Sequence, residues 1–149
     1  MSTKPAFSVL LVEPVELLRR TVSLTVRSLG SAEVTEAATY PTAQQVCNRR
    51  RFDAAVIAVD WPPSGVQCRG LTLIEQIRQG DCASTATIPI AVLVESCNTE
   101  LLHVLRSSRI SRILIKPFRV RDVIDTIDGM RTLAKGPAPA YGRDGFPLN

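Results

Sequence analysis

This 149-residue chain has few of the residue patterns that mark metal or redox chemistry. Its four cysteines, at positions 47, 68, 82 and 97, form no Cys-x-x-Cys pair, and His103 is the only histidine. Because zinc and redox motifs depend on such spacing, none is expected here. We therefore predict no metal site and free thiols, with Cys68, in a predicted loop, as the most reactive of the four.

Long apolar runs are also missing. The longest are only a few residues, too short to span a bilayer, and the first six residues contain no apolar signal core. We therefore expect a cytoplasmic protein with no membrane segment. Hydrophobic residues nevertheless make up 45% of the chain, which is enough for the core of one globular domain.

Signals for nucleotide or nucleic-acid binding are weak. The turn Glu13-Pro14-Val15-Glu16 has no glycine or hydroxyl and would repel a phosphate, so a nucleotide or flavin site ranks low. The net charge is +4, but Arg49-Arg50-Arg51 is the only dense basic run, and it ends a predicted helix, where cations complement the helix dipole. No nucleic-acid recognition motif accompanies it. We therefore do not expect nucleic acid as a partner.

What the sequence does contain is a regular alternation of short apolar runs and helical patterns. Apolar or alternating runs predict strands at 8–12, 33–37, 54–59, 88–94 and 110–115. Helical spacing of apolar residues predicts helices at 15–29, 41–50, 70–78, 99–106 and 120–133. Strict alternation of this kind indicates an α/β fold, a doubly wound parallel sheet of five strands with helices on both faces, in three layers.

The first predicted helix has clear start and stop signals. Pro14 can open it and Gly30 can close it. Its predicted buried stripe consists of Val15, Leu17, Leu18, Val22, Val26 and Leu29. The predicted domain spans 8–134, between an N-terminal tail at 1–7 and a disordered C-terminal tail at 135–149 that is rich in proline and glycine. In such sheets the functional crevice lies at the carboxyl ends of the strands.

Over about residues 7–134 the chain resembles the receiver domain of bacterial two-component response regulators. The motifs that carry the resemblance are Val9-Leu10-Leu11-Val12 before an acid, Phe52-Asp53, Trp61-Pro62, Gly70-Leu71, Ile88-Pro89-Ile90 and Lys116-Pro117-Phe118. The resemblance implies a flavodoxin-like strand order of 2-1-3-4-5, a cis peptide bond before Pro117 and a role in signal transduction.

The residues that the resemblance assigns to phosphoryl chemistry are mostly replaced. The position matching the phosphoacceptor aspartate, five residues after Asp53, is Ala58, whose methyl group has no lone pair for attack on a phosphoryl donor. Lys116 is retained. The other positions are Glu13 followed by Pro14 at the acidic pair, Val94 at the hydroxyl, Ile113 at the aromatic switch and Arg109 at the glycine before the fifth strand.

We therefore expect a degenerate phosphorylation pocket in a chain that is not an enzyme and needs no cofactor. Lys116 is expected to pair with Glu13, with Asp60 or Glu95 nearby. The alternative is an active receiver in a two-component phosphorelay, phosphorylated in an unusual register on Asp60. Mg²⁺ would be required only in that case.

The function expected from this pattern is phosphorylation-independent protein–protein interaction. The resemblance implies that a protein partner, or a second copy, binds the face made by the fourth helix, fifth strand and fifth helix. An ordinary solvated surface is an equal alternative. The residues of this predicted face are His103, Arg106, Arg109, Arg112, Arg119, Arg121, Asp122 and Asp125.

Overall fold

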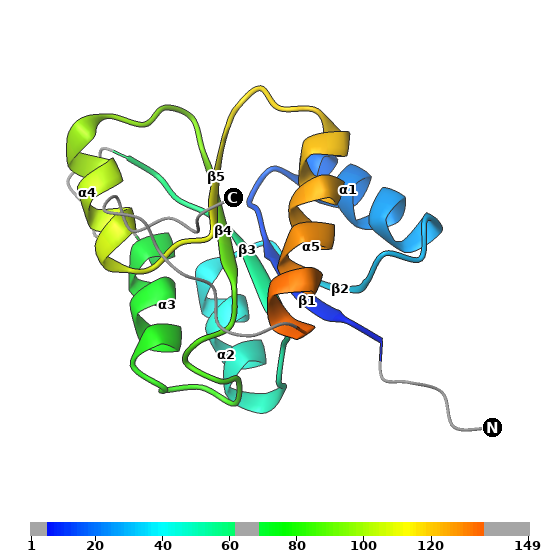
Figure 1. The fold of residues 1–149 in the computed structure, drawn as a ribbon, viewed down its shortest axis with the longest axis horizontal. Helices are drawn as coiled ribbons and strands as arrows, with labels where there is room; N and C mark the ends of the chain where they lie inside the picture. Colours follow the sequence, from blue (N-terminus) through cyan, green and yellow to red (C-terminus); the bar gives the residue numbers. More distant parts are fainter. Residues whose placement is uncertain (1–5, 62–68, 136–149) are drawn as a thin grey trace.

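The computed structural model describes residues 6–61 and 69–135. Within these residues, strands and helices alternate five times along the chain (Figure 1). The strands are β1 Ser8–Val12, β2 Glu33–Ala37, β3 Ala54–Ala58, β4 Ile90–Val94 and β5 Arg112–Ile115. The helices are α1 Glu16–Ser28, α2 Tyr40–Arg49, α3 Arg69–Arg78, α4 Thr99–Ser107 and α5 Val120–Lys135.

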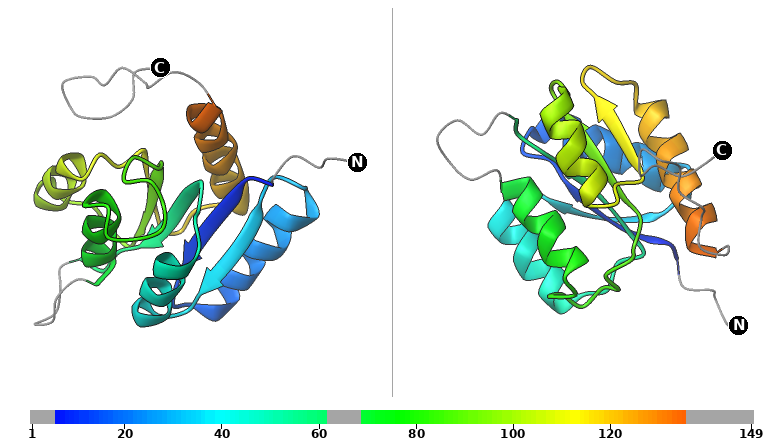
Figure 2. Two further views of the ribbon diagram at one scale, coloured as in Figure 1. Left: turned by 90° about the horizontal axis from the view of Figure 1, so that it is seen from below. Right: turned by 60° about the vertical axis from the view of Figure 1, so that its left-hand side comes forward.

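All five strands are parallel and form one sheet in the order β2-β1-β3-β4-β5. This confirms the predicted fold class and strand order. Helices α1 and α5 cover one face of the sheet, and α2, α3 and α4 cover the other, which gives the expected three layers (Figure 2). Parallel strands require such crossover helices, and right-handed crossovers place them on both faces.

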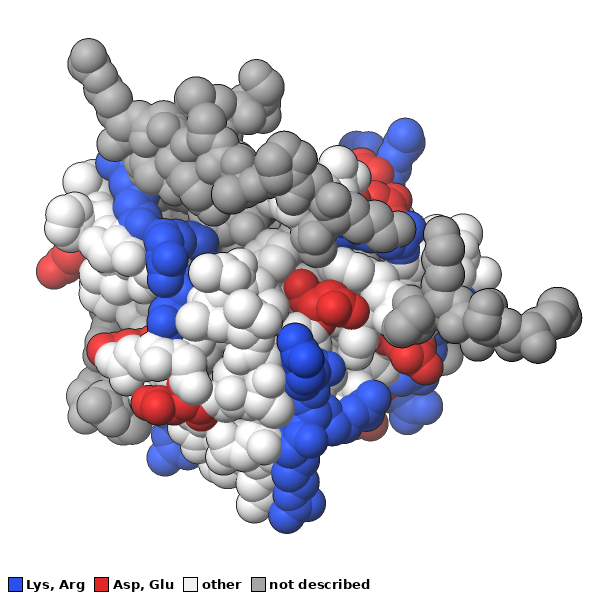
Figure 3. Space-filling view, turned by 60° about the horizontal axis from the view of Figure 1, so that its bottom comes forward, with Lys and Arg blue, Asp and Glu red and all other residues white. Residues whose placement is uncertain are grey.

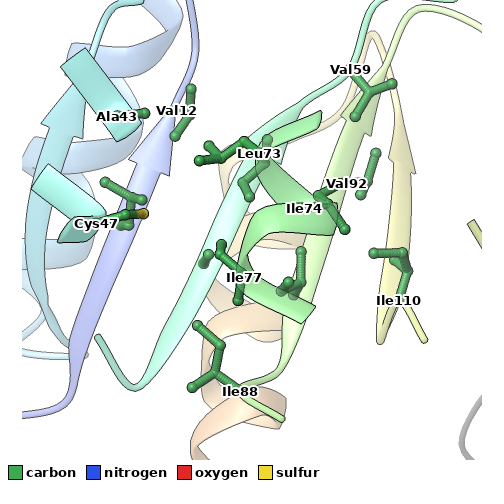
Figure 4. Packing of buried hydrophobic residues seen from close by; sticks show 14 of the residues in the cluster. Val12, Ala43, Cys47, Val59, Leu73, Ile74, Ile77, Ile88, Val92 and Ile110 are labelled. Atoms are coloured by element: carbon green, nitrogen blue, oxygen red, sulfur yellow. The ribbon is translucent and has the colours of Figure 1, made fainter. Parts of the chain in front are cut away.

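The strand residues divide between two cores because neighbouring side chains point to opposite faces. Leu10 and Val12 belong to the core under α2, α3 and α4, whereas Val9 and Leu11 belong to the core under α1 and α5. Every residue of β3 and β4 is buried, as predicted for strands covered on both faces. Figure 4 shows part of the first core, where Leu73, Ile74 and Ile77 of α3 pack on the sheet.

Three strands are shorter than predicted. β3 ends at Ala58 rather than 59, β4 begins at Ile90 rather than 88, and β5 begins at Arg112 rather than 110. Pro89 has no N–H to donate to a neighbouring strand, so pairing of β4 starts after it. A turn precedes β5, in which Arg109 has a φ of 57°. Apolar character alone does not mark these ends, since Ile88 and Ile110 remain buried outside the strands.

The start of α1 differs from the prediction. Pro14 lies before the helix, which begins at Glu16 with Val15 as its N-cap residue. The N–H of Val15 is bound by the Glu13 carboxylate, so Val15 keeps an extended conformation. The predicted stop is confirmed, because Gly30 follows the helix with a φ of 67°, a conformation that glycine adopts most easily.

The predicted buried stripe of α1 is wrong in part. Val22 and Val26 are buried, but Leu17 is 78% exposed, and Val15 and Leu29 are also exposed. Leu17 and Val26 are nine residues apart, which places them on opposite sides of a helix with 3.6 residues per turn. Only one of these two sides can face the sheet, and Leu17 lies on the other.

At the amino edge of the sheet, Arg78 ties two connections together. Its guanidinium donates to the carbonyls of Ala86 and Ile88, which lead into β4, and to those of Ser108 and Arg109, which lead into β5. The donor–acceptor distances are 2.7 to 3.0 Å. This use of Arg78 has no signal in the sequence, where it is one more basic residue at the end of a helix.

The cysteines that the structure describes are free thiols, as predicted. Cys47 is buried, which raises the pKa of its thiol to about 12, and the thiol of Cys82 adds to the shift. Cys82 and Cys97 are half-buried. Cys68 lies outside the described residues, as do the rest of 62–68 and most of the predicted C-terminal tail. No helix in the described part is long and apolar enough to span a bilayer.

Candidate functional site at the carboxyl edge of the sheet

Glu13 follows β1 and is the most buried charged residue at this edge, with 1% of its surface exposed. One carboxylate oxygen, Oε2, accepts from the Val15 N–H at 2.9 Å. The other, Oε1, lies 2.7 Å from the Lys116 ammonium, as a charge contact without the angle of a directed hydrogen bond. The Glu13 carboxylate therefore joins the start of α1 to the end of β5.

Lys116 follows β5 and reaches back across the strand ends. Its N–H donates to the Val94 carbonyl at 2.8 Å, which extends the β4–β5 pairing by one residue. Its ammonium is 2.7 Å from Glu13 and 3.6 Å from Glu95. The Glu95 side chain is 75% exposed, so water screens that second contact. The predicted Lys116–Glu13 pair is confirmed, and so is the cis peptide bond between Lys116 and Pro117.

Ala58 is the last residue of β3, between β1 and β4, and is 4% exposed. Its methyl group packs into the core under α1 and α5. Its carbonyl accepts from the Tyr40 hydroxyl at 2.7 Å. At this point α3 also approaches β3 closely, because a Cβ on Gly70 would clash with the Ala58 carbonyl oxygen. Position 58 therefore holds a packed apolar side chain, and its backbone oxygen already accepts a hydrogen bond.

Asp60 lies two residues beyond Ala58, after β3 has ended, and is exposed. Between them, Val59 packs into the opposite core, so the chain still alternates at this point. Val94 ends β4 and is fully buried, and Ile113 packs against the same core from β5. Two positions that the resemblance assigns to a hydroxyl and an aromatic ring thus hold aliphatic side chains within a core.

Arg19 and Glu36 also meet at this edge, a contact that the sequence did not predict. Arg19 of α1 donates to the Glu13 carbonyl at 3.0 Å and to the Glu36 carboxylate at 3.2 Å. These two contacts hold the Arg19 side chain in place, and only 12% of it is exposed. The available signal was a basic residue in the first turns of a helix, where the macrodipole disfavours a cation, so such a residue needs a partner of its own.

The side chains at this edge do not suit Mg²⁺. That ion prefers several hard oxygen ligands in octahedral geometry. Glu13 is already neutralised by Lys116, and Pro14 carries no donor. Among the described residues there is no group of three or more His, Cys, Asp or Glu side chains placed to hold a metal ion. A carboxylate nucleophile is likewise missing at position 58.

The residues of the predicted partner face lie on α4, β5, α5 and their connections. All are exposed except Asp122, which is half-buried. The Asp122 carboxylate accepts from the Arg119 N–H at 2.9 Å and so caps the start of α5. The basic residues of this face are surface residues, whereas Asp122 has a local structural use.

Comparison with known proteins gives matches in structure. The chemotaxis protein CheY4 of Vibrio cholerae is 24% identical with a TM-score of 0.71, covering 84% of this chain and 98% of that one. The receiver domain of the Francisella response regulator 1452 is 21% identical with a TM-score of 0.70, covering 86% and 98%. A response regulator from Thermotoga maritima is 18% identical with a TM-score of 0.69, covering 85% and 98%.

No protein-family model and no curated sequence matches the chain. Identities of this size are evidence of shared architecture, and the order of strands and helices agrees with it. The chain therefore has the fold of response-regulator receiver domains.

Proposed function

We propose that this chain is a receiver-like signalling module that acts by binding a protein, without accepting a phosphoryl group. The observation that carries the proposal is the contact between Lys116 and Glu13 beside the methyl group of Ala58. A strand-end lysine that could neutralise a phosphoryl group is here neutralised by a carboxylate of its own chain. Its charge then compensates a buried carboxylate, which would be costly to leave unpaired, instead of binding a ligand.

The aliphatic residues around this pair support the proposal. A phosphorylation switch needs a hydroxyl that moves toward the new phosphoryl oxygen and a side chain that fills the space it leaves. Val94 cannot donate a hydrogen bond, and Ile113 is already packed against the core. The carboxyl edge therefore has neither the nucleophile nor the moving parts for such a switch.

Phosphoryl transfer is tested with acetyl phosphate and Mg²⁺, followed by intact-mass measurement of the full chain. We expect no gain in mass, and none in the Asp60→Asn variant. A working receiver, matched in concentration, serves as the positive control. The alternative function, phosphorylation of Asp60, requires a phosphoryl adduct in the unchanged chain that is absent from Asp60→Asn. That outcome would overturn the proposal.

The proposed partner surface is the face of α4, β5 and α5. Its exposed arginines Arg106, Arg112 and Arg121 and its exposed acid Asp125 give it the mixed polar character common at the rims of protein interfaces. Figure 3 shows the molecule turned so that the bottom of the view in Figure 1 comes forward, and there too basic and acidic side chains lie near one another. This interspersed charge fits protein partners better than the continuous phosphate backbone of a nucleic acid.

The partner surface is tested by charge reversal. The double variant Arg112→Glu, Arg121→Glu should lose most of its binding to a partner captured by the unchanged chain, because rim charges set the complementarity of such interfaces. Arg51→Glu, in the connection before β3, is the matched control and should bind normally. Equal binding by the double variant, with an unchanged melting temperature, would exclude this face.

A further inference from the structure

Helix α1 presents an apolar stripe to solvent. Leu17 is 78% exposed and Leu24 is 57% exposed. They are two turns apart, and the exposed residues Thr21 and Ser28 continue the same line at spacings of four, three and four. We call Leu17, Thr21, Leu24 and Ser28 the α1 stripe. Its large side chains do not contribute to the core, which receives Val22 and Val26 from the other side of the helix.

The α1 stripe has charges of opposite sign on one flank. Glu16 and Arg27 are eleven residues apart, about three helical turns, so they lie on the same side of the stripe near its two ends. Both are exposed. Within the chain Glu16 has only a loose contact with Arg20, at 3.8 Å between side chains that are 72% and 63% exposed. Arg27 also donates a hydrogen bond to the Val34 carbonyl of β2. Glu16 and Arg27 thus carry opposite charges at opposite ends of the same exposed flank.

We propose that a second copy of this chain docks on the α1 stripe, with the two α1 helices antiparallel about a two-fold axis. The charges of Glu16 and Arg27 favour a second copy as the occupant and an antiparallel arrangement of the two helices. A two-fold axis perpendicular to both helices keeps each flank on its own side and reverses the order along it. Glu16 of each copy then faces Arg27 of the other, and this pair forms twice.

The same register interdigitates the leucines. With the axis between Thr21 and Val22, Leu17 of one copy lies level with the gap between Leu24 and Ser28 of the other. Leu24 lies level with the gap between Thr21 and Leu17. The smaller Thr21 and Ser28 leave room for the leucines, in the manner of knobs and holes between helices. A parallel two-fold pair would instead place the Glu16 and Arg27 flanks of the two copies on opposite sides of the seam, so that neither contact forms.

This dimer uses a different surface from the proposed partner face. Helix α1 covers the sheet beside α5 (Figure 1). The α1 stripe lies on the side of the helix away from the sheet, because Leu17 and Leu24 are exposed whereas Val22 and Val26 are in the core. The contact is small, because α1 has 13 residues and is about 20 Å long. Small interfaces give weak complexes, so the dimer forms in a concentration-dependent manner and closes at two copies.

Sedimentation velocity of the full chain over a concentration series tests the proposal. The sedimentation coefficient should rise with concentration toward that of a dimer. Leu17→Glu and Leu24→Glu together should abolish the rise, because they place charges in the centre of the apolar seam. Leu29→Glu changes an equally exposed leucine beyond the end of the helix and should leave the rise unchanged. Thermal melting of each variant checks that it is folded.

The charge pair gives a sharper experiment. Glu16→Arg alone and Arg27→Glu alone should each weaken dimerisation about tenfold, since both contacts of the dimer become like-charged. Mixing the two single variants should restore association, because each contact between them again joins an acid and a base. The double exchange Glu16→Arg, Arg27→Glu should also restore it within one chain.

The outcomes are separable from those of the proposed function. Reversal of Arg112 and Arg121 should leave this dimer intact. A chain that stays monomeric at the highest concentration, or a dimer unaffected by Leu17→Glu and Leu24→Glu, would overturn the proposal. Failure of the two single charge variants to associate on mixing would exclude the antiparallel register. A different protein that binds the α1 stripe of a strictly monomeric chain would also overturn it.

Discussion

The two edges of the sheet are held by long basic side chains in different ways. At the amino edge, Arg78 donates to four backbone carbonyls, which are neutral and lie in the connections that precede β4 and β5. At the carboxyl edge, Lys116 faces the carboxylate of Glu13, and that carboxylate is buried. A planar guanidinium can serve several acceptors in fixed directions, whereas an ammonium acts as a compact charge. Each edge therefore uses the basic group that suits its acceptors.

This difference changes what a lost contact costs. If the Arg78 guanidinium is removed, the carbonyls that are near the surface can bind water instead. Four hydrogen bonds are nevertheless lost together. The Glu13 carboxylate, at 1% exposure, has no water to replace Lys116. Lys116, which the sequence marks as a candidate functional residue, therefore contributes to stability in the same sense as Arg78, which no sequence motif marks.

The largest effect is expected at the amino edge. Arg78→Met should lower the free energy of unfolding by about 4 kcal/mol, because several charge-assisted bonds to carbonyls are lost together. Arg78→Lys keeps the charge but not the fork of donors and should recover less than about half of this loss. Urea denaturation measures both. If Arg78→Met lost no more stability than Lys116→Met, the expected difference between the two edges would be wrong.

The ion pair at the carboxyl edge should rank second. Lys116→Met is expected to cost about 3 kcal/mol, since it leaves the buried Glu13 carboxylate without its counter-charge. Glu13→Gln in the same chain should restore part of that stability, because the amide carries no charge and can still accept from Val15. The double variant and both single variants form a cycle that measures the coupling by denaturation. Additive losses would mean that the two charges do not interact.

The approach of α3 to β3 gives a third test at the carboxyl edge. Gly70→Ala should cost about 2 kcal/mol, because the added methyl group would clash with the Ala58 carbonyl and meet the Val59 Cα at 3.2 Å. Gly129→Ala, in α5 with nothing within 4 Å, is the matched control and should gain about 0.5 kcal/mol or more. Similar changes at both glycines would show that α3 can shift away from Ala58 without loss.

The smallest effect concerns the turn that Arg78 holds. Arg109→Gly should gain about 1 kcal/mol, since Arg109 has a φ of 57°, which is unfavourable for a residue with a Cβ. Gly30→Ala, at a φ of 67° with open space around it, should lose a similar amount. Chemical denaturation measures both. A loss of stability in Arg109→Gly would show that the arginine side chain contributes more than its backbone costs.

The predicted fold was confirmed because its signals are local and repeated. The apolar residues of β1, β3 and β4 and the spacing of α5 each point to one element, and their order points to one architecture. The Lys116–Glu13 pair could be predicted for the same reason, as both residues directly follow strands of a parallel sheet. Position 109 carried a usable signal too, since the residue found where a glycine was expected adopts a glycine-like φ.

What the sequence could not predict depends on contacts between distant segments. The role of Arg78 requires knowledge that the approaches to β4 and β5 end beside α3. Arg19 required the position of Glu36 on β2. The error on α1 has another origin: Leu17 and Val26 are both apolar, and hydrophobicity alone did not decide which side of the helix faces the sheet. The function of the partner face was an expectation from resemblance and stays a prediction.

The burial of Cys47 has a practical consequence for following the motions of the molecule. With a pKa of about 12, its thiol is almost entirely protonated at neutral pH, and an alkylating reagent must wait for α2 to lift from its neighbours. Its alkylation rate, followed by peptide mass spectrometry beside that of the more accessible Cys97, should therefore report how often this part of the domain opens. Equal rates at the two cysteines would mean that α2 opens as fast as the reagent arrives. Cys47 is thus a native probe of local unfolding that requires no introduced cysteine or dye.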